Sequence, residues 1–284
     1  MIRELQSRVI REAWKDEPAS WGRVEEAAAG LLETVDITAI PVWDSGRRRR
    51  EVLDLVEQLR ATAGQDYSRS LFSRPRTAGA LTHALRYAVE LGDPQAALSL
   101  SDAVDLLDET LGSDHPDALA ARGGLAAAYQ AADRLEQAIF LFERTLTDSE
   151  HILGSDHPHT LTSRGNLANT YWSAGRRDEA IDLYEQNLAD RERFLGPDHS
   201  CTLTSRDDLA YAYQSAGRLD KAVPLFEQIL ADRERRLGSD HTSTRLFRKK
   251  LADAYRAVGR DEDAEALLDP PPASDHAEEN RPDD

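Results

Sequence analysis

The five-residue pattern Leu-Gly-x-Asp-His occurs four times in this chain at a constant spacing. The copies begin at Leu111, Leu153, Leu195 and Leu237, so the repeat length is 42 residues. A fixed period of roughly 20 to 50 residues is typical of a solenoid, in which each repeat buries its apolar face against its neighbours. We therefore expect most of the chain to consist of stacked copies of one structural unit.

Each copy contains two segments with helical periodicity. In the copy that begins at Leu153, a helical wheel of about 100° per residue places Leu167, Ala168 and Tyr171 on one side and Asn166 and Asn169 on the other. The second segment has a single apolar stripe, which in the three full copies consists of Ala138, Leu141, Phe142 and Leu146, of Ala180, Leu183, Tyr184 and Leu188, and of Ala222, Leu225, Phe226 and Leu230. The pattern predicts an all-α fold of paired amphipathic helices.

Punctuation residues separate the two helices of a pair. Gly175, Gly217 and Gly259 stand where a left-handed residue ends the first helix, and Asp133 takes that position in the first full copy. The Asp-His of the repeated pentapeptide, followed by proline in two copies, supplies the cap and first-turn signals of the next helix.

These residues resemble those of a known family. The pattern Leu-Ala-x-x-Tyr, Gly-Arg and x-x-Ala with an aromatic residue four positions later resembles the tetratricopeptide repeat. The 42-residue form with Leu-Gly-x-Asp-His-Pro between copies is similar to the repeats of kinesin light chains and to the C-terminal arrays of actinobacterial NB-ARC-type signal-transduction ATPases. The resemblance covers residues 69–269 and implies a right-handed superhelical solenoid of antiparallel helix pairs, preceded by a small helical segment. It is specific for fold and weak for function.

The periodicity also predicts the domain organisation. We expect an N-terminal helical connector with helices at residues 1–15, 20–35 and 48–63, in which IRELQSRVIREAW resembles the connector of NB-ARC-type proteins, followed by a polar link at 64–76. The expected regions are the connector (1–68), a degenerate repeat (69–110), three full repeats (111–152, 153–194 and 195–236), a truncated repeat (237–269) and a disordered acidic tail (270–284).

Composition excludes several classes of partner. The net charge of −17 argues against binding a phosphate backbone, which requires clustered Lys and Arg. The N-terminus lacks a signal-peptide core, and no run of 18 apolar residues occurs, so we expect a cytoplasmic protein without a membrane partner. The single cysteine, Cys201, cannot form an internal disulfide. The four basic residues from Arg47 to Arg50 are interpreted as a solvated charge run, with a docking site for an acidic partner as the alternative.

No catalytic constellation or cofactor motif is present. The chain has no Gly-Lys dipeptide, G-x-S-x-G or H-E-x-x-H. The repeated Asp-His pairs are two helices apart, too far to share one metal ion, so we interpret them as caps. Cys201 beside His199 near a helix start is the one candidate for nucleophilic chemistry, weighed against an ordinary surface thiol.

A repeated arginine occurs on the packed side of each first helix. A guanidinium there must find a carboxylate, and we predict an arginine–acid ladder. The arginines are Arg122, Arg164, Arg206 and Arg248, with Glu143, Glu185 and Glu227 as first-choice partners and Asp148, Asp190 and Asp232 next.

The opposite side of the first helix carries residues that differ between copies. In tetratricopeptide proteins that stripe lines a concave groove in which peptides lie, so the resemblance implies a ligand-binding groove here. The expected groove residues are Thr162, Asn166, Asn169, Trp172, Ser173, Thr204, Asp208, Tyr211, Lys250 and Asp253. Trp172 is either an exposed anchor or a cover for a neighbouring helix.

The predicted function is a protein-interaction scaffold or sensor module that binds a peptide or protein segment, with no enzymatic activity, cofactor or metal. One alternative is an enzyme that uses Cys201 and His199. Another is a structural connector from a larger signal-transduction ATPase. The sequence leaves the oligomeric state open.

Overall fold

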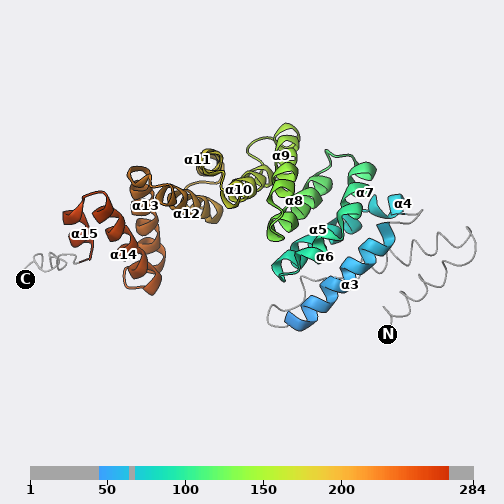
Figure 1. Ribbon diagram of the computed structural model, residues 1–284, viewed down its shortest axis with the longest axis horizontal. Coiled ribbons are helices and arrows are strands. Elements are labelled where there is room, and N and C mark those ends of the chain that lie inside the picture. The colour runs from blue at the N-terminus through green and yellow to red at the C-terminus, as the bar shows by residue number, and fades with distance from the viewer. Residues whose placement is uncertain (1–44, 64–67, 269–284) are drawn as a thin grey trace, which may run out of the picture. The chain divides into compact units, whose positions relative to one another are not determined.

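A computed structural model describes residues 45–63 and 68–268, and all secondary structure in these ranges is helical (Figure 1). The helices predicted at 1–15 and 20–35, the NB-ARC-like connector motif and the acidic tail lie outside these ranges. The chain divides into two compact units, an N-terminal unit that ends at Leu183 and a C-terminal unit that begins at Tyr184. No helix in the described ranges is long and apolar enough to cross a membrane.

The N-terminal unit packs as successive helix pairs. Helix α8 lies against α9 and α5, and α9 lies against α10, while α3 contacts α5 and α7. The helices are α3 (Ser45–Ala63), α4 (Ser68–Phe72), α5 (Pro75–Glu90), α6 (Pro94–Leu98), α7 (Ser101–Leu111), α8 (Pro116–Ala131), α9 (Leu135–Ile152) and α10 (Pro158–Ser173). Helix α11 (Arg177–Phe194) runs through the boundary between the units.

The C-terminal unit repeats this packing. Helix α13 lies between α12 and α14, and α15 lies on α14. The helices are α12 (Ser200–Ser215), α13 (Leu219–Leu237), α14 (Thr242–Ala257) and α15 (Asp261–Leu268). The predicted all-α solenoid of tetratricopeptide type is therefore confirmed.

The helix boundaries follow from the repeated punctuation. His115, His157, His199 and His241 are the N-cap residues of the first helices, and each ring Nδ1 accepts a backbone N–H two residues later at 3.2 Å. This bond satisfies one of the free amides at a helix start. The predicted capping role of the histidines is confirmed.

The ends of the first helices also agree with the prediction. Gly175, Gly217 and Gly259 have φ of 77°, 72° and 78°, and Asp133 has φ of 58° in the same place. The left-handed residue lets the chain reverse into the second helix of the pair.

The polar link predicted at 64–76 is wrong in part, because residues 68–72 form α4. Leu71 and Phe72 are fully buried there and join the core formed by α3, α5 and α7. The surrounding serines and arginines hid these two apolar anchors in the sequence. The helix predicted at 48–63 is confirmed, with Val52, Leu55 and Leu59 buried.

The basic run at the start of α3 is only partly solvated. The Arg48 guanidinium lies 4.7 Å from the centroid of the Tyr87 ring, and Arg49 pairs with Asp93 at 3.6 Å. The macrodipole disfavours cations at a helix start, and these two contacts offset that effect.

Candidate binding surfaces of the first helices

The first helix of each repeated pair is α8, α10, α12 or α14. One side of each of these helices packs against neighbouring helices, and the other side stays accessible. We call the accessible side the first-helix flank. In α10, Leu167, Ala168 and Tyr171 are buried. Asn169 is exposed, and Asn166, on the same side, is half-buried. The repeat period therefore predicted correctly which side of α10 is packed.

The other predicted residues of α10 lie along or near this flank. Thr162 and Ser173 are exposed, and their hydroxyls donate to the backbone carbonyls of Pro158 and Asn169 at 2.8 and 2.9 Å. Trp172 is half-buried, with the Arg177 guanidinium 5.4 Å from its ring centroid. A cation from α11 therefore covers part of the indole. This arrangement is intermediate between the two predicted alternatives, an exposed anchor and a cover for a neighbouring helix.

In the C-terminal unit, the flanks of α12 and α14 meet. Tyr211 is 41% exposed, and the Nζ of Lys250 lies 3.2 Å from its ring centroid. The Tyr211 ring also contacts Phe226 edge-on at 6.0 Å. Burial lowers the pKa of Lys250, and the nearby Asp207 carboxylate opposes that shift. The structure therefore brings two predicted groove residues together as a cation–aromatic pair.

The remaining predicted residues of this unit lie on the same helices. Thr204 and Asp253 are exposed and Asp208 is half-buried. Burial raises the pKa of the Asp208 carboxyl, the Asp207 charge raises it further, and Arg191 opposes both effects. Burial also raises the pKa of Asp207, against the Arg233 guanidinium. Both acids are therefore partly desolvated, Asp207 near Arg233 and Asp208 near Arg191.

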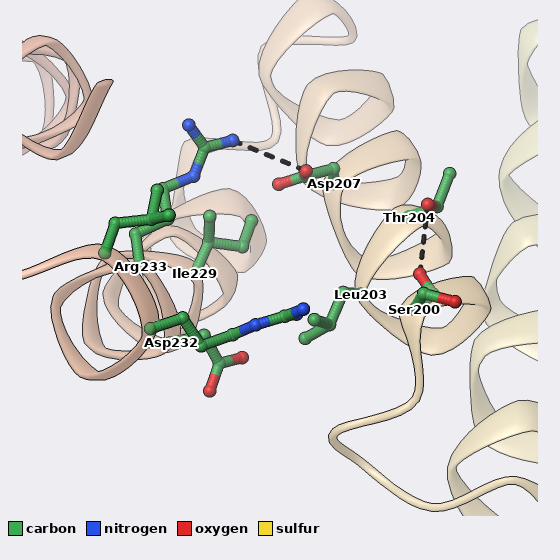
Figure 2. Close-up of a pocket in the computed structure, with 9 residues that line it drawn as sticks. Ser200, Leu203, Thr204, Asp207, Ile229, Asp232 and Arg233 are labelled. Atoms are coloured by element: carbon green, nitrogen blue, oxygen red, sulfur yellow. Dashed lines mark hydrogen bonds and ion pairs between the residues drawn. The ribbon is translucent and has the colours of Figure 1, made fainter. Parts of the chain in front are cut away.

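A pocket of about 310 Å³ opens between α12 and the second half of α13 (Figure 2). Arg233 extends toward Asp207 across it, with a closest N–O distance of 3.5 Å, and Leu203 and Ile229 supply apolar walls. The lining residues are Ser200, Leu203, Thr204, Asp207, Ile229, Asp232, Arg233, Arg236 and Leu237.

Of these lining residues, the sequence predicted Thr204 as a groove residue and Asp232 only as a ladder acid. The variable position 207, which is Gly123, Gly165 and Lys249 in the other copies, was the signal that could have marked the pocket. The lining residues of α13 could not be predicted, because a helical wheel of α12 does not show which residues of a neighbouring helix face it.

On the packed side of the first helices, the predicted arginine–acid ladder is present. The shortest guanidinium–carboxylate distances are 2.5 Å for Arg122 with Asp148, 2.7 Å for Arg164 with Glu150, 2.6 Å for Arg206 with Asp232 and 2.5 Å for Arg248 with Glu234. Arg122 also pairs with Asp108 at 3.2 Å and Arg206 with Glu192 at 2.8 Å. The ladder is structural because Arg122, Arg164 and Arg206 are buried.

The first-choice acids, however, were wrong. Glu143 and Glu227 accept hydrogen bonds from Tyr171 and Tyr255 at 2.5 and 2.8 Å, and Glu185 accepts one from Tyr213. A cation completes each cluster, with Arg176, Lys221 and Arg260 over the respective tyrosine rings. This repeated tyrosine–glutamate–cation contact was missed by the sequence reasoning.

Profile comparisons agree with this repeated geometry. One profile described as tetratricopeptide repeat matches residues 141–189, 159–235 and 208–269, and a second one matches 118–159. A solved structure of nearly identical TPR-like repeats, assigned to a kinesin light chain of Podosopora anserina, is 35% identical to the chain. The chain belongs to the tetratricopeptide repeat family.

Structural similarity to other tetratricopeptide repeat proteins supports the fold. The Podosopora anserina repeats align with a TM-score of 0.61 over 69% of this chain and 93% of that one. BtubC (BKLC) from P. vanneervenii is 22% identical, with a TM-score of 0.60 over 79% of this chain and 88% of that one. The apo form of RapI is 12% identical, with a TM-score of 0.51 over 78% and 90%. No curated protein sequence matches the chain significantly.

The surface cysteine of the tetratricopeptide array lies at a capped helix start. Cys201 is exposed, and its backbone N–H donates to the Nδ1 of His199. That imidazole nitrogen is therefore occupied by the cap. Across residues 45–63 and 68–268, no three His, Cys, Asp or Glu side chains are grouped so as to hold a metal ion.

Proposed function

We propose that this tetratricopeptide repeat protein is a non-enzymatic scaffold that binds a segment of another protein along its first-helix flanks. The observation that carries the proposal is the contrast between the two sides of these helices. The packed side repeats Leu, Ala and Tyr in every copy, whereas one exposed position changes from Asn169 to Tyr211 to Asp253. Fixed packing with variable exposed chemistry is what a recognition surface requires.

The chemistry of the flanks suits a polypeptide ligand. Asn169 in α10 offers an amide that can bond a ligand backbone, and Tyr211 in α12 offers an exposed aromatic face. Aromatic and amide side chains of this kind are frequent anchors in protein interfaces. Asn166 and Trp172 belong to the proposed surface of the N-terminal unit, and Lys250 belongs to that of the C-terminal unit. A cytoplasmic location is part of the proposal.

Site-specific cross-linking in the source cells tests the proposal. A photo-reactive residue replaces Asn169 or Tyr211 in the full chain, and Gln186, exposed on α11, serves as the control position. We expect a defined partner to cross-link at the two flank positions and not at the control. In the chain with the photo-reactive residue at position 169, the further substitution Asn166→Ala should reduce cross-linking through α10. Equal cross-linking at all three positions would overturn the proposal.

Alkylation of Cys201 separates the scaffold from the enzymatic alternative. The thiol lies on the first turn of α12, and no interaction found for the flank residues involves it. Partner capture by the alkylated chain should therefore equal that of the untreated chain. A reaction catalysed by the untreated chain and lost on alkylation would favour the alternative.

A further inference from the structure

Within residues 45–63 and 68–268, the N-terminal half of α14 lacks the cover that the second half of α13 gives to the equivalent part of α12. In α12, Leu203 is half-buried and lies opposite Ile229 and other residues in the second half of α13 (Figure 2). The helix that follows α14 is shorter, because α15 ends at Leu268, which corresponds to Phe226 in the middle of α13. In the described part of the chain, α14 thus has the counterpart of only the first half of α13.

Helix α14 also has an exposed apolar side chain. Leu246 is 66% exposed, although Phe247 beside it is buried against the Phe226 ring, 5.7 Å between centroids. Positions 203 and 204 are Leu and Thr, whereas the equivalent positions of α14 are Arg245 and Leu246. The apolar residue has moved from the covered position to the exposed one.

Two cations flank this leucine. Arg245 and Lys249 are both exposed, and at a spacing of i and i+4 they lie on one side of the helix. Neither makes an ion pair with a carboxylate of residues 45–63 or 68–268. The other cations of α14 are engaged: Arg248 pairs with Glu234, Lys250 lies over Tyr211, and Arg256 pairs with Asp253. We call Arg245, Leu246 and Lys249 the α14 patch.

Comparison with α12 indicates the charge of what would cover the patch. In α12, the first helix supplies the acid Asp207 and α13 supplies the cation Arg233. In α14, Lys249 stands at the position of Asp207, so the sign is inverted. A complementary helix must therefore carry acids where α13 carries arginines, and an apolar residue to cover Leu246.

We propose that an acidic amphipathic helix of a partner protein docks on the α14 patch, in the place that the second half of α13 takes against α12. The inference rests on the proposed scaffold function and names a partner class and a position outside the residues used for its cross-linking test. A net charge of −17 disfavours non-specific binding of an acidic segment. Any such binding must therefore come from a local basic surface.

A pair of peptides tests the inference with the full chain. The first peptide copies residues 227–237 (EQILADRERRL) with Arg233→Glu, Arg235→Glu and Arg236→Glu, and the second keeps the arginines. Each carries a fluorophore, and anisotropy gives the affinity at low and moderate ionic strength. We expect the acidic peptide to bind about tenfold more tightly than the basic one, with a loss on adding salt. Absence of binding, or preference for the basic peptide, overturns the inference.

Substitutions in the patch give the matched controls. Arg245→Glu/Lys249→Glu should reverse the preference, and Leu246→Ser should weaken the acidic peptide about tenfold, the order expected for losing one apolar anchor. Arg50→Glu/Arg60→Glu on α3 makes the same change in net charge at exposed positions and should leave the preference unchanged. Equal loss in the α3 variant would assign binding to overall charge and overturn the inference.

Two further outcomes separate the competing explanations. If the acidic peptide binds only after residues 269–284 are removed, the occupant is the chain's own acidic segment, and the partner proposal is overturned. If partners cross-link at Asn169 and Tyr211 but the acidic peptide does not bind, only this inference fails. If the peptide binds and no partner cross-links at those positions, the patch is supported and the flank proposal fails.

Discussion

At the scale of single residues, Arg206 is a charge whose loss should be costly. It is 5% exposed and pairs with both Asp232 and Glu192. Replacing it with alanine removes the buried cation from both carboxylates, of which Asp232 keeps Arg235 at 2.7 Å. Because the Glu192 side chain is 40% exposed and can regain water, we expect Arg206→Ala to lower the free energy of unfolding by about 2–3 kcal/mol, below the value for a fully buried pair.

Urea unfolding measures this loss, and Arg248→Ala provides the matched comparison. Its side chain is 18% exposed, and the side chain of its carboxylate partner, Glu234, is 36% exposed. We expect Arg248→Ala to cost about 1 kcal/mol, as for partly exposed ion pairs. A larger loss for Arg248→Ala than for Arg206→Ala would contradict burial as the determinant of the ladder's strength.

Asp208 should be destabilising at neutral pH. Burial and the neighbouring Asp207 raise its pKa above the usual range, so the folded chain binds the proton at a higher pH than the unfolded chain does. Stability from this group is present at low pH and is lost as the pH rises through the folded pKa. We expect Asp208→Asn to raise the urea midpoint at pH 7 and to leave it nearly unchanged in acid.

The control for that measurement is Asp182→Asn at an exposed position of α11, which should leave the midpoint unchanged at both pH values. A midpoint at pH 7 that falls in Asp208→Asn would mean that attraction to Arg191 outweighs burial.

The ladder shows how far the sequence can predict single residues. The 42-residue period placed Arg122 and Arg206 on the packed side, and burial confirms it. The first-choice acids were wrong because a helical wheel shows which side of a helix a residue lies on. It does not show which residue of an antiparallel neighbouring helix lies at the same level along the helix axis. Arg122 lies in the first half of α8 and therefore meets Asp148 near the end of α9, while Glu143 lies nearer the middle.

At the scale of elements, the tyrosine–glutamate contacts between successive helices should make stability sensitive to alkali. Burial, with the hydrogen bonds to Glu143 and Glu227, raises the pKa of Tyr171 and Tyr255 to about 12. An unfolded tyrosine ionises near about 10, so the folded chain keeps these protons longer and loses stability as the pH rises from about 10 to about 12. Tyr171→Phe/Tyr255→Phe should flatten this decline in the thermal midpoint.

Tyr129→Phe is the control for the alkaline titration. The position equivalent to Glu143 is Ser101 in the preceding copy, so Tyr129 lacks that carboxylate. Tyr129→Phe therefore removes a tyrosine without removing a tyrosine–glutamate contact. An equal flattening in Tyr129→Phe would assign the effect to tyrosine content instead of the contact.

The turn between paired helices gives a second prediction for elements. Gly217 has φ of 72°, and a Cβ built there meets no atom within 4 Å. The cost of Gly217→Ala is therefore backbone strain alone, about 1 kcal/mol in the free energy of unfolding. Asp133→Gly should be close to neutral, because relief of strain is offset by the greater freedom of glycine in the unfolded chain. Chemical denaturation of both variants checks the contrast, and a neutral Gly217→Ala would contradict it.

Elements were predicted best where the period is intact. Helices α8 to α14 follow the repeated caps and glycines, whereas α4 was read as a link, and the second helix of the degenerate repeat is divided into α6 and α7. Leu100, fully buried between those two segments, anchors the break through packing that no local pattern reveals. Tertiary burial decides the structure where the repeat degenerates.

At the scale of the whole molecule, the sequence predicted the architecture and left recognition open. A constant period fixes what each helix packs on, because neighbouring copies present the same face. The pocket beside Thr204 and the uncovered α14 patch depend on which copy follows which. Such features arise from differences between copies, and a pattern of similarity cannot predict them.

Removal of one complete period tests this view of the whole chain. Deleting residues 195–236 joins Phe194 to Leu237, so that each remaining helix meets a neighbour with the same repeated stripe. Since stability in repeat proteins is close to a sum of nearest-neighbour terms, we expect the shortened chain to keep its helical circular dichroism per residue and to unfold at a somewhat lower urea concentration. Deleting residues 195–233 instead removes three residues fewer and breaks the phase of the period. That variant should lose cooperative unfolding, because each following helix would turn its polar side toward the core. Equal behaviour of the two deletions would show that the 42-residue register does not hold the fold together.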